Sequence, residues 1–324
     1  MFTDSELLEK INDYISKLTY AKNPRGLYEP IEYAMSLGGK RVRPVLMMMA
    51  YNLYHDDVDR ILSQAAGIEM YHNYSLMHDD LMDNSDMRRG KPTVHKKWGR
   101  NTALLSGDAM LMIAYKLMTG SGGSYVPPVM RLFSETAMQI CEGQQLDMEF
   151  ETRNDVYEHE YLEMIRLKTS VLLAASLKIG ALLAEAPHDD TQFLYDFGIN
   201  VGIAFQLRDD LLDVYGDEKT FGKKIGADIL SNKKTYLLIQ ALRRGNEEQV
   251  KELKKWLEAK DFDPVEKIKS VTALFDEIDV RSLCEDRIAH YTLLAETNID
   301  MVKVPEEKKQ LLVDEMNKLM HREA

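Results

Sequence analysis

The placement of proline most constrains what this chain can fold into. Proline breaks helix interiors, so the long proline-free spans are free to form long helices. Within them apolar residues recur every three or four positions, as in a helix with one buried face. The prolines are at positions 24, 30, 44, 92, 127, 128, 187, 264 and 305. Two apolar repeats are Val58, Ile61, Leu62, Ala65, Ala66 and Ile68, and Leu167, Val171, Ala174, Ala175 and Leu182.

These patterns predict an all-α protein. We expect about ten to thirteen helices, several of them longer than about 20 residues, in a single large bundle. We expect no strand, because alternating patterns bounded by Asn-Gly or Asp-Gly turns are missing. Thr3 and Glu6 have the spacing of a capping box. No stretch resembles a linker, so we expect a single domain over residues 1–324.

Charge and composition exclude several classes of protein. The 41 Lys and Arg against 53 Asp and Glu give a net charge of −12, which disfavours a general nucleic-acid binder. The longest apolar stretch, 171–186, is shorter than the roughly 20 residues that span a bilayer. The start of the chain does not resemble a secretory signal. The two cysteines, Cys141 and Cys284, cannot form a disulfide framework, so we expect a cytoplasmic protein without stable membrane insertion.

Two similar acidic segments carry the main chemical signal. Residues 78–83 read HDDLMD and residues 208–213 read RDDLLD. On a helix, side chains four apart share a face, so each segment places two carboxylates together in an apolar context. Such carboxylates repel each other unless a cation lies between them, and oxygen ligands favour Mg²⁺. The alternative is a solvated helix face or a partner for the dipole at a helix N-terminus.

Small basic groups occur near these segments. They suit small anions better than a polymer, because Arg and Lys are the usual ligands of a diphosphate. The sequence has no GxxxxGK[ST] or GxGxxG loop, no HExxH and no CxxC, so it does not support a nucleotide or zinc site. The basic groups comprise Lys40, Arg41 and Arg43; Arg88 and Arg89; Lys168; Lys223 and Lys224; and Lys233 and Lys234.

Seven segments occur in an order that is typical of one enzyme family. They are GGKRVRP at 38–44, HNYSLMHDDLMDNSDMRRGKPTVH at 72–95, LLSGDAML at 104–111, EGQQLD at 142–147, RLKTSVLLAAS at 166–176, FQLRDDLLDVYGD at 205–217 and FGKKIGADILSNKKT at 221–235. Together they resemble the trans-isoprenyl diphosphate synthases, the polyprenyl synthetase family that includes farnesyl and geranylgeranyl diphosphate synthases. The resemblance implies long helices around a central cavity, with the two aspartate clusters facing each other across its mouth.

The resemblance also implies roles for individual residues. Asp79 and Asp83 would bind Mg²⁺ from one wall, with Asp80 supporting, and Asp209 and Asp213 from the other. The ligands of the allylic diphosphate would be Arg88, Lys168, Lys223 and Lys233. The ligands of isopentenyl diphosphate would be Lys40, Arg43, His72 and Arg89. Thr169 and Gln206 would lie near the reacting carbons.

The implied chemistry is a condensation. Ionisation of an allylic diphosphate (dimethylallyl, geranyl or farnesyl) gives a stabilised cation, which the double bond of isopentenyl diphosphate attacks. The released diphosphate then takes the proton, so no protein nucleophile is required. A terpene cyclase or a non-catalytic subunit of a heteromeric prenyl synthase are the alternatives, and the family is usually homodimeric.

Two tyrosines bear on the length of the product. Tyr74 and Tyr71 lie five and eight residues before Asp79. On one helix these rings would point into the cavity and form a floor that stops elongation. The alternative is that both rings pack sideways against neighbouring helices. The floor favours a fifteen-carbon product, farnesyl diphosphate, with the twenty-carbon geranylgeranyl diphosphate close behind.

Overall fold

The protein is helical along most of its length, which confirms the all-α prediction. The structure is a computed structural model, and it describes residues 1–20, 22–120, 122–217 and 225–320. The chain forms two compact units, each built from segments that are distant in sequence. Unit 1 comprises Met1–Ser134, Ala175–Gln192 and Val304–Leu312; unit 2 comprises Glu135–Ala174, Phe193–Lys303 and Val313–Ala324. The single domain expected for residues 1–324 stays a prediction.

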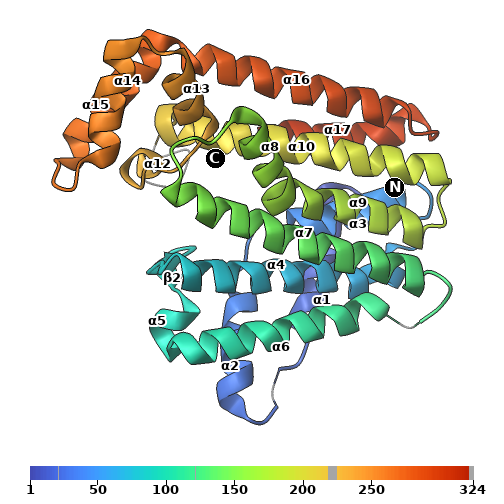
Figure 1. Cartoon of the computed structure of the whole chain (residues 1–324). Coiled ribbons are helices and arrows are strands. Elements are labelled where there is room, and N and C mark those ends of the chain that lie inside the picture. The colour runs from blue at the N-terminus through green and yellow to red at the C-terminus, as the bar shows by residue number, and fades with distance from the viewer. Residues whose placement is uncertain (21, 121, 218–224, 321–324) are drawn as a thin grey trace. The chain divides into compact units, whose positions relative to one another are not determined.

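Unit 1 is organised around α4. Every residue from Gln64 to Tyr71 in this helix is buried, so this part of α4 is covered on all sides. α4 and α6 lie side by side (Figure 1), and they approach closely at Gly67, where an added Cβ would be 3.2 Å from the carbonyl oxygen of Ala114. The first elements of unit 1 are α1 (Asp4–Ser16), α2 (Arg25–Ser36), α3 (Val42–Asn52), the 3₁₀ turn η1 (Val58–Ile61), α4 (Leu62–Met82), α5 (Val94–Trp98) and α6 (Arg100–Thr119).

Unit 2 has its own apolar core. Leu207 and Leu211 of α10 are buried in one cluster with Phe275 and Cys284 from later helices. Among the helices that the structure describes, four have residues in both units: α7 (Val126–Thr152), α9 (Val171–Leu183), α10 (His188–Tyr215) and α17 (Glu306–Met320). The remaining elements are α8 (Glu158–Ile165), the π-helix η2 (Arg166–Ser170), α12 (Ala227–Leu230), α13 (Tyr236–Arg244), α14 (Glu247–Glu258), α15 (Pro264–Ile278) and α16 (Val280–Asp300).

One strand pair corrects the expectation of no strands. β1 (Met87–Arg88) pairs antiparallel with β2 (Lys91–Pro92). The two residues of the turn, Arg89 and Gly90, have φ values of 53° and 72°, as a type I′ hairpin turn requires. The prediction was wrong here because an Arg-Gly pair makes the turn that Asn-Gly or Asp-Gly usually makes. The hairpin thus fixes the backbone positions from which the side chains of Arg88 and Arg89 extend.

Other local predictions concern helix ends and helix number. The capping box at Thr3 and Glu6 is confirmed: the Thr3 hydroxyl accepts from the Glu6 N–H, and the Glu6 carboxylate accepts from the Thr3 N–H. The structure also has short helices, such as α5 and α12, that the apolar periodicity does not predict because they carry no full apolar period. Within the part of the chain that the structure describes, no helix combines the length and apolarity needed to cross a bilayer.

Candidate active site

The first aspartate cluster lies at the C-terminal end of α4. Asp79 and Asp80 are in its last turn, and Asp83 is its C-cap residue. The helix dipole is negative at this end, so it repels carboxylates rather than stabilising them. A role as partner of a helix N-terminus is therefore excluded for this cluster. Asp83 is exposed and Asp79 is half-buried, which leaves both accessible to a cation.

Asp80 is held by Arg88 of the hairpin. Its side chain is 5% exposed, and it accepts from the Nη2 of Arg88 at 2.6 Å and from the Nε at 3.1 Å. Burial raises the pKa of Asp80, and the guanidinium opposes that rise. Arg88 also lies 3.9 Å from Asp79. The arginine thus links the two neighbouring carboxylates, with Asp80 as its main partner and Asp79 on the more accessible side.

Arg43 and His72 form a second basic group in unit 1. The Nη1 of Arg43 is 3.1 Å from the Nε2 of His72. Burial, followed by the charges of Arg43 and Arg89, holds the pKa of His72 well below its usual value, so the ring is neutral at pH 7. The Nε of Arg43 is buried and has no hydrogen-bond partner among the residues that the structure describes. A buried donor of this kind is expected where an anionic ligand completes the site.

The glycine-rich loop before α3 approaches the hairpin. Arg89 donates from its Nη1 to the carbonyl oxygen of Gly38. At Gly39, whose φ is 135°, an added Cβ would lie 2.8 Å from the Cζ of Arg89. The positive φ favours glycine at this position, and a side chain here would also displace the Arg89 guanidinium. Lys40 follows the two glycines and is exposed to solvent.

Arg41 of the same loop has a different role from its neighbours. It has a left-handed backbone (φ 49°), and its Nη1 lies 2.6 Å from the Oε1 of Glu69, with side-chain exposures of 4% and 1%. Arg41 also donates to the carbonyl of Met35, and Asn73 donates to Glu69 at 2.9 Å. Sequence reasoning counted Arg41 among the basic groups without assigning it a ligand role, and it missed Glu69. The pair fixes the loop to α4.

The second aspartate cluster lies near the C-terminal end of α10, again where the helix dipole disfavours carboxylates. Asp210 is buried and accepts from the hydroxyl of Tyr161 and from the Nε2 of Gln206 at 3.0 Å. Burial raises the pKa of Asp210. Asp209, its neighbour, is half-buried. Asp210 is therefore an internally bonded member of the second cluster, as Asp80 is of the first.

Asp213 connects the second cluster to α12, the short helix that comes before Lys233. One of its carboxylate oxygens accepts from the N–H of Asp228 at 3.0 Å. The Nζ of Lys233 lies 3.6 Å from the Oδ1 of Asp228. Burial lowers the pKa of Lys233, but the carboxylates of Asp210 and Asp228 outweigh it, so the pKa lies above its usual value. Lys233 is thus charged. The predicted ligand Lys223, with Lys224, lies outside the described residues.

The π-helix η2 carries Lys168 and Thr169. The Nζ of Lys168 is 2.6 Å from the Oδ2 of Asp147, and the Thr169 hydroxyl is 3.3 Å from the Oε1 of Gln206. An added Cβ at Gly143 would lie 2.4 Å from the backbone nitrogen of Lys168, so α7 packs directly on this segment. The sequence analysis gave no role to Asp147, although this residue ends the EGQQLD segment.

The predicted floor residues differ in their surroundings. Tyr71 is 1% exposed, and its ring centroid lies 5.2 Å from that of Phe133 in α7. Tyr74 is half-buried and packs edge-on against His78 at 4.8 Å. Tyr71 therefore has the sideways packing of the alternative interpretation. The role of either ring in product length stays a prediction.

The donor atoms fit a hard divalent ion. Among the described residues, no three His, Cys, Asp or Glu side chains form a preformed metal cluster. Mg²⁺ commonly uses one or two carboxylates, waters and phosphate oxygens of the substrate, so it needs no such cluster. The oxygen-only clusters fit an ion that arrives with a diphosphate. The predicted ligands fall in different units, and their convergence on one ligand stays a prediction.

Comparison with known proteins agrees with the family resemblance found in the sequence. The family model described as "Polyprenyl synthetase" matches residues 24–275. The chain is 40% identical over 254 residues to a short chain isoprenyl diphosphate synthase of Methanocaldococcus jannaschii, covering 78% of this chain and 77% of that one. A crystal structure of a geranylgeranyl pyrophosphate synthase superimposes with a TM-score of 0.95 at 42% identity over 100% of both chains. A polyprenyl synthase from Caulobacter crescentus complexed with calcium and isoprenyl diphosphate gives a TM-score of 0.87 at 27% identity, covering 99% and 96%.

Proposed function

The chain belongs to the polyprenyl synthetase family, and from this we propose that it is a Mg²⁺-dependent trans-prenyltransferase that joins isopentenyl diphosphate to an allylic diphosphate. The observation that carries the proposal is the repeated arrangement of the acidic clusters. Each lies at or near the electrostatically unfavourable end of a helix and combines buried carboxylates that accept hydrogen bonds, Asp80 in the first and Asp210 and Asp213 in the second, with carboxylates that reach the surface. Two such clusters in one chain indicate binding of divalent cations.

The basic residues divide by unit. In unit 2, Lys168 and Lys233 are charged amines beside carboxylates, and in unit 1 Arg88 lies beside Asp79. We propose that these three hold the diphosphate of the allylic substrate, together with Lys223. Mg²⁺, when bound by Asp79, Asp83, Asp209 and Asp213, would neutralise the charge that builds on the leaving diphosphate.

A second set of residues suits isopentenyl diphosphate. Arg43 and Arg89 present guanidinium groups, Lys40 an exposed amine, and His72 a neutral ring that can donate one hydrogen bond. Thr169 and Gln206 bond to each other and offer a hydroxyl and an amide. These groups can stabilise an allylic cation without the nucleophilicity that would trap it.

The product is the finer part of the proposal. The sequence favoured fifteen carbons, on the argument from Tyr74 and Tyr71. The relatives do not confirm that preference: the solved structure with 42% identity over the whole chain is named a geranylgeranyl pyrophosphate synthase. We therefore propose the twenty-carbon geranylgeranyl diphosphate as main product, made from dimethylallyl, geranyl or farnesyl diphosphate. We expect the protein to act in the cytoplasm.

A condensation assay tests the proposal. Purified protein is incubated with Mg²⁺, isopentenyl diphosphate and each allylic primer in turn, and the products are sized by chromatography. We expect a twenty-carbon prenyl diphosphate, no product with EDTA, and a loss of at least about 100-fold in Asp79→Asn and Asp209→Asn. The control Asp286→Asn changes an exposed aspartate of α16 and should retain full activity.

Other outcomes would identify the alternatives. A cyclised hydrocarbon formed from a prenyl diphosphate without isopentenyl diphosphate would indicate a terpene cyclase. No Mg²⁺-dependent condensation with any primer would refute the proposal and favour a non-catalytic subunit.

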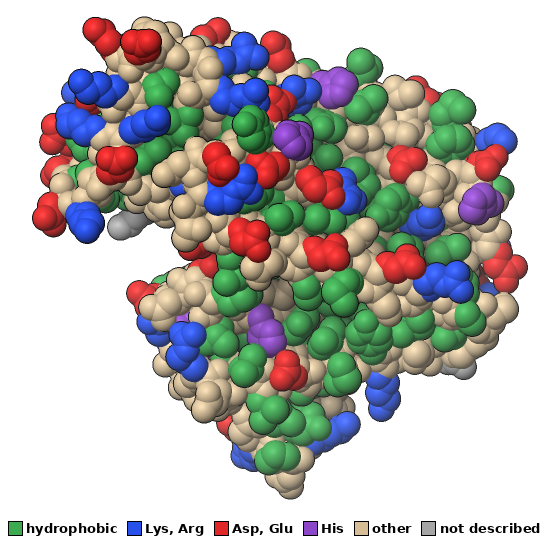
Figure 2. Space-filling model, in the orientation of Figure 1, with side chains coloured by type: hydrophobic (Ala, Val, Ile, Leu, Met, Phe, Trp, Pro, Cys, Tyr) green, Lys and Arg blue, Asp and Glu red, His purple; other side chains and the backbone are tan. Residues whose placement is uncertain are grey.

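We propose that the protein acts as a homodimer. Leu104, Leu105 and Met112 share one face of α6 and are 49%, 61% and 60% exposed. Figure 2 shows apolar side chains gathered over the part of unit 1 where α6 lies. A row of large exposed apolar side chains on one long helix suits a second copy of the same surface, because a twofold interface is self-complementary.

A further inference from the structure

Lys233 follows a residue whose backbone is fixed in an unusual conformation. Asn232 has a φ of 57°, in the left-handed region that asparagine tolerates better than most residues. Its N–H donates to the carbonyl of Ile229 at 3.3 Å, and its own carbonyl accepts from the Nζ of Lys234 at 3.3 Å. In the turn before Lys233, both backbone polar groups of Asn232, its N–H and its carbonyl, therefore form hydrogen bonds.

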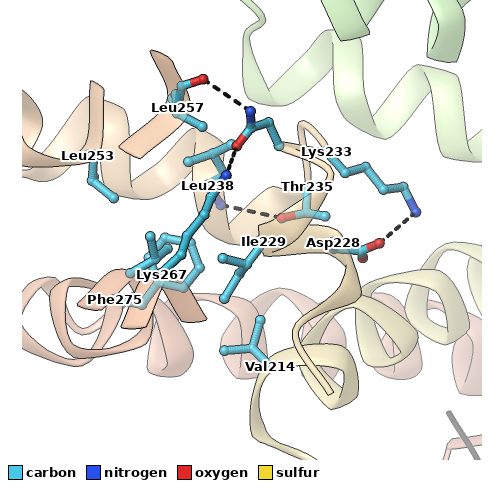
Figure 3. Close-up of a pocket in the computed structure, with 12 residues that line it drawn as sticks. Val214, Asp228, Ile229, Lys233, Thr235, Leu238, Leu253, Leu257, Lys267 and Phe275 are labelled. Atoms are coloured by element: carbon cyan, nitrogen blue, oxygen red, sulfur yellow. Dashed lines mark hydrogen bonds and ion pairs between the residues drawn. The ribbon is translucent and has the colours of Figure 1, made fainter. Parts of the chain in front are cut away.

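The side chain of Asn232 is bonded at both ends as well. Its Nδ2 donates to the carbonyl of Leu257 in α14 at 3.1 Å, and its Oδ1 accepts from the Nζ of Lys267 in α15 at 2.6 Å. Figure 3 shows both bonds, with Leu257 and Lys267 approaching from separate helices and Lys233 extending toward Asp228. Every polar atom of Asn232 thus has a partner, and two of these partners come from the later helices α14 and α15.

Lys267 is an unusual residue for this place. Its side chain is 1% exposed and lines a pocket with Leu253, Val271 and Phe275. Its ammonium lies 4.2 Å from the ring centre of Phe262, and in the described part of the chain it forms no ion pair with a carboxylate. Burial lowers the pKa of Lys267. Burying an amine in apolar surroundings costs free energy, and a methionine of similar length would avoid that cost.

We propose that Asn232 and Lys267 are positioning residues that hold the turn before Lys233, so that its ammonium meets the diphosphate of the allylic substrate. The inference rests on the proposed function, which makes Lys233 a diphosphate ligand. Lys233 has a long flexible side chain, so its reach depends on where its backbone is held. The bond from Lys267 fixes the asparagine amide, the amide fixes the left-handed turn, and the turn sets the origin of the Lys233 side chain. Partners behind a ligand commonly affect affinity or activity by about 10- to 100-fold.

Substitution of the buried lysine tests the inference. In Lys267→Met we expect the KM for the allylic diphosphate to rise about tenfold, while the KM for isopentenyl diphosphate stays within about twofold. Asn232→Gly keeps the left-handed backbone but loses both side-chain bonds, so it should show the same split, and it decides the question if Lys267→Met does not fold. Lys269→Met, at an exposed position of the same helix, is the matched control and should behave as wild type.

A double-mutant cycle separates positioning from general stability. If Lys267 acts through Lys233, then Lys233→Met/Lys267→Met has the same allylic KM as Lys233→Met alone. Three results would overturn the inference. The effects of Lys233→Met and Lys267→Met on the allylic KM could multiply in the double variant, the KM values of both substrates could rise equally, or both Lys267→Met and Asn232→Gly could show wild-type kinetics. If wild-type protein makes no prenyl product, the proposed function fails. Titration of inorganic diphosphate with Mg²⁺ then still decides the inference, because Lys267→Met should bind it about tenfold more weakly.

Discussion

The buried pair of Arg41 and Glu69 yields the sharpest prediction. The two side chains are 4% and 1% exposed, and their closest nitrogen and oxygen are 2.6 Å apart. Glu69→Gln keeps the shape of the side chain but leaves the Arg41 guanidinium buried without its counter-charge. Breaking such a pair from one side costs about 3–5 kcal/mol. With about 2.1 cal/mol/K of unfolding entropy per residue, a chain of 324 residues should lose about 4–7 °C in Tm.

Thermal unfolding followed by far-UV circular dichroism measures this loss. Glu285→Gln is the matched control, because Glu285 pairs with Arg281 at 3.0 Å but the side chains are 45% and 57% exposed. We expect its Tm to fall by less than about 1 °C, since exposed pairs contribute little. Arg41→Met/Glu69→Met should recover part of the loss, because no charge then stays buried. Equal Tm shifts in Glu69→Gln and Glu285→Gln would show that the reasoning from burial is wrong.

Three further predictions concern pH, product and assembly. The pKa of His72 is lowered in the folded protein, so at acidic pH the unfolded chain binds a proton that the folded chain does not. The free energy of unfolding should therefore fall below about pH 6.5, by up to about 1.4 kcal/mol per pH unit. In His72→Gln the dependence of Tm on pH should be shallower over pH 5–6.5, and an unchanged slope would contradict this. Tyr74→Ala with Tyr71→Ala should give longer products on chromatography, at a cost of about 3–5 kcal/mol for the buried Tyr71, and an unchanged product length would dispose of the floor. Leu105→Glu with Met112→Lys should convert a dimer to a monomer in sedimentation analysis, and a dimer that survives both charges must use another surface.

The fold was largely predictable because helices are local. An apolar residue every three or four positions determines the buried face of a helix, and the sequence displays this period directly. The hairpin at Met87–Pro92 was not predictable in this way, because its two strands have two residues each and its turn uses Arg89 with Gly90. Short segments of this kind depend on tertiary contacts, such as the bonds from Arg88 to Asp80.

The candidate site was predictable at the level of motifs. Both aspartate clusters and most basic residues stand out as short segments of unusual composition. The partners of those residues do not. Nothing in GGKRVRP distinguishes Arg41, which pairs with a buried glutamate 28 residues away, from Arg43, which contacts His72. Lys267 likewise reads as one more lysine of an amphipathic helix, because only the folded chain brings it to Asn232.

The π-helix at Arg166–Ser170 restricts how this protein can vary. A segment of this type has one residue more in its turn than an α-helix, and each residue of an α-helix turns by about 100°. Deleting one residue would therefore swing Lys168 away from Asp147. Gly143 and Gly202 pack against the same segment, where an added Cβ would meet backbone atoms of Lys168 and Ser170 at 2.4 and 2.5 Å. Natural variants should accordingly keep both the length of this segment and the two glycines, and accept insertions elsewhere.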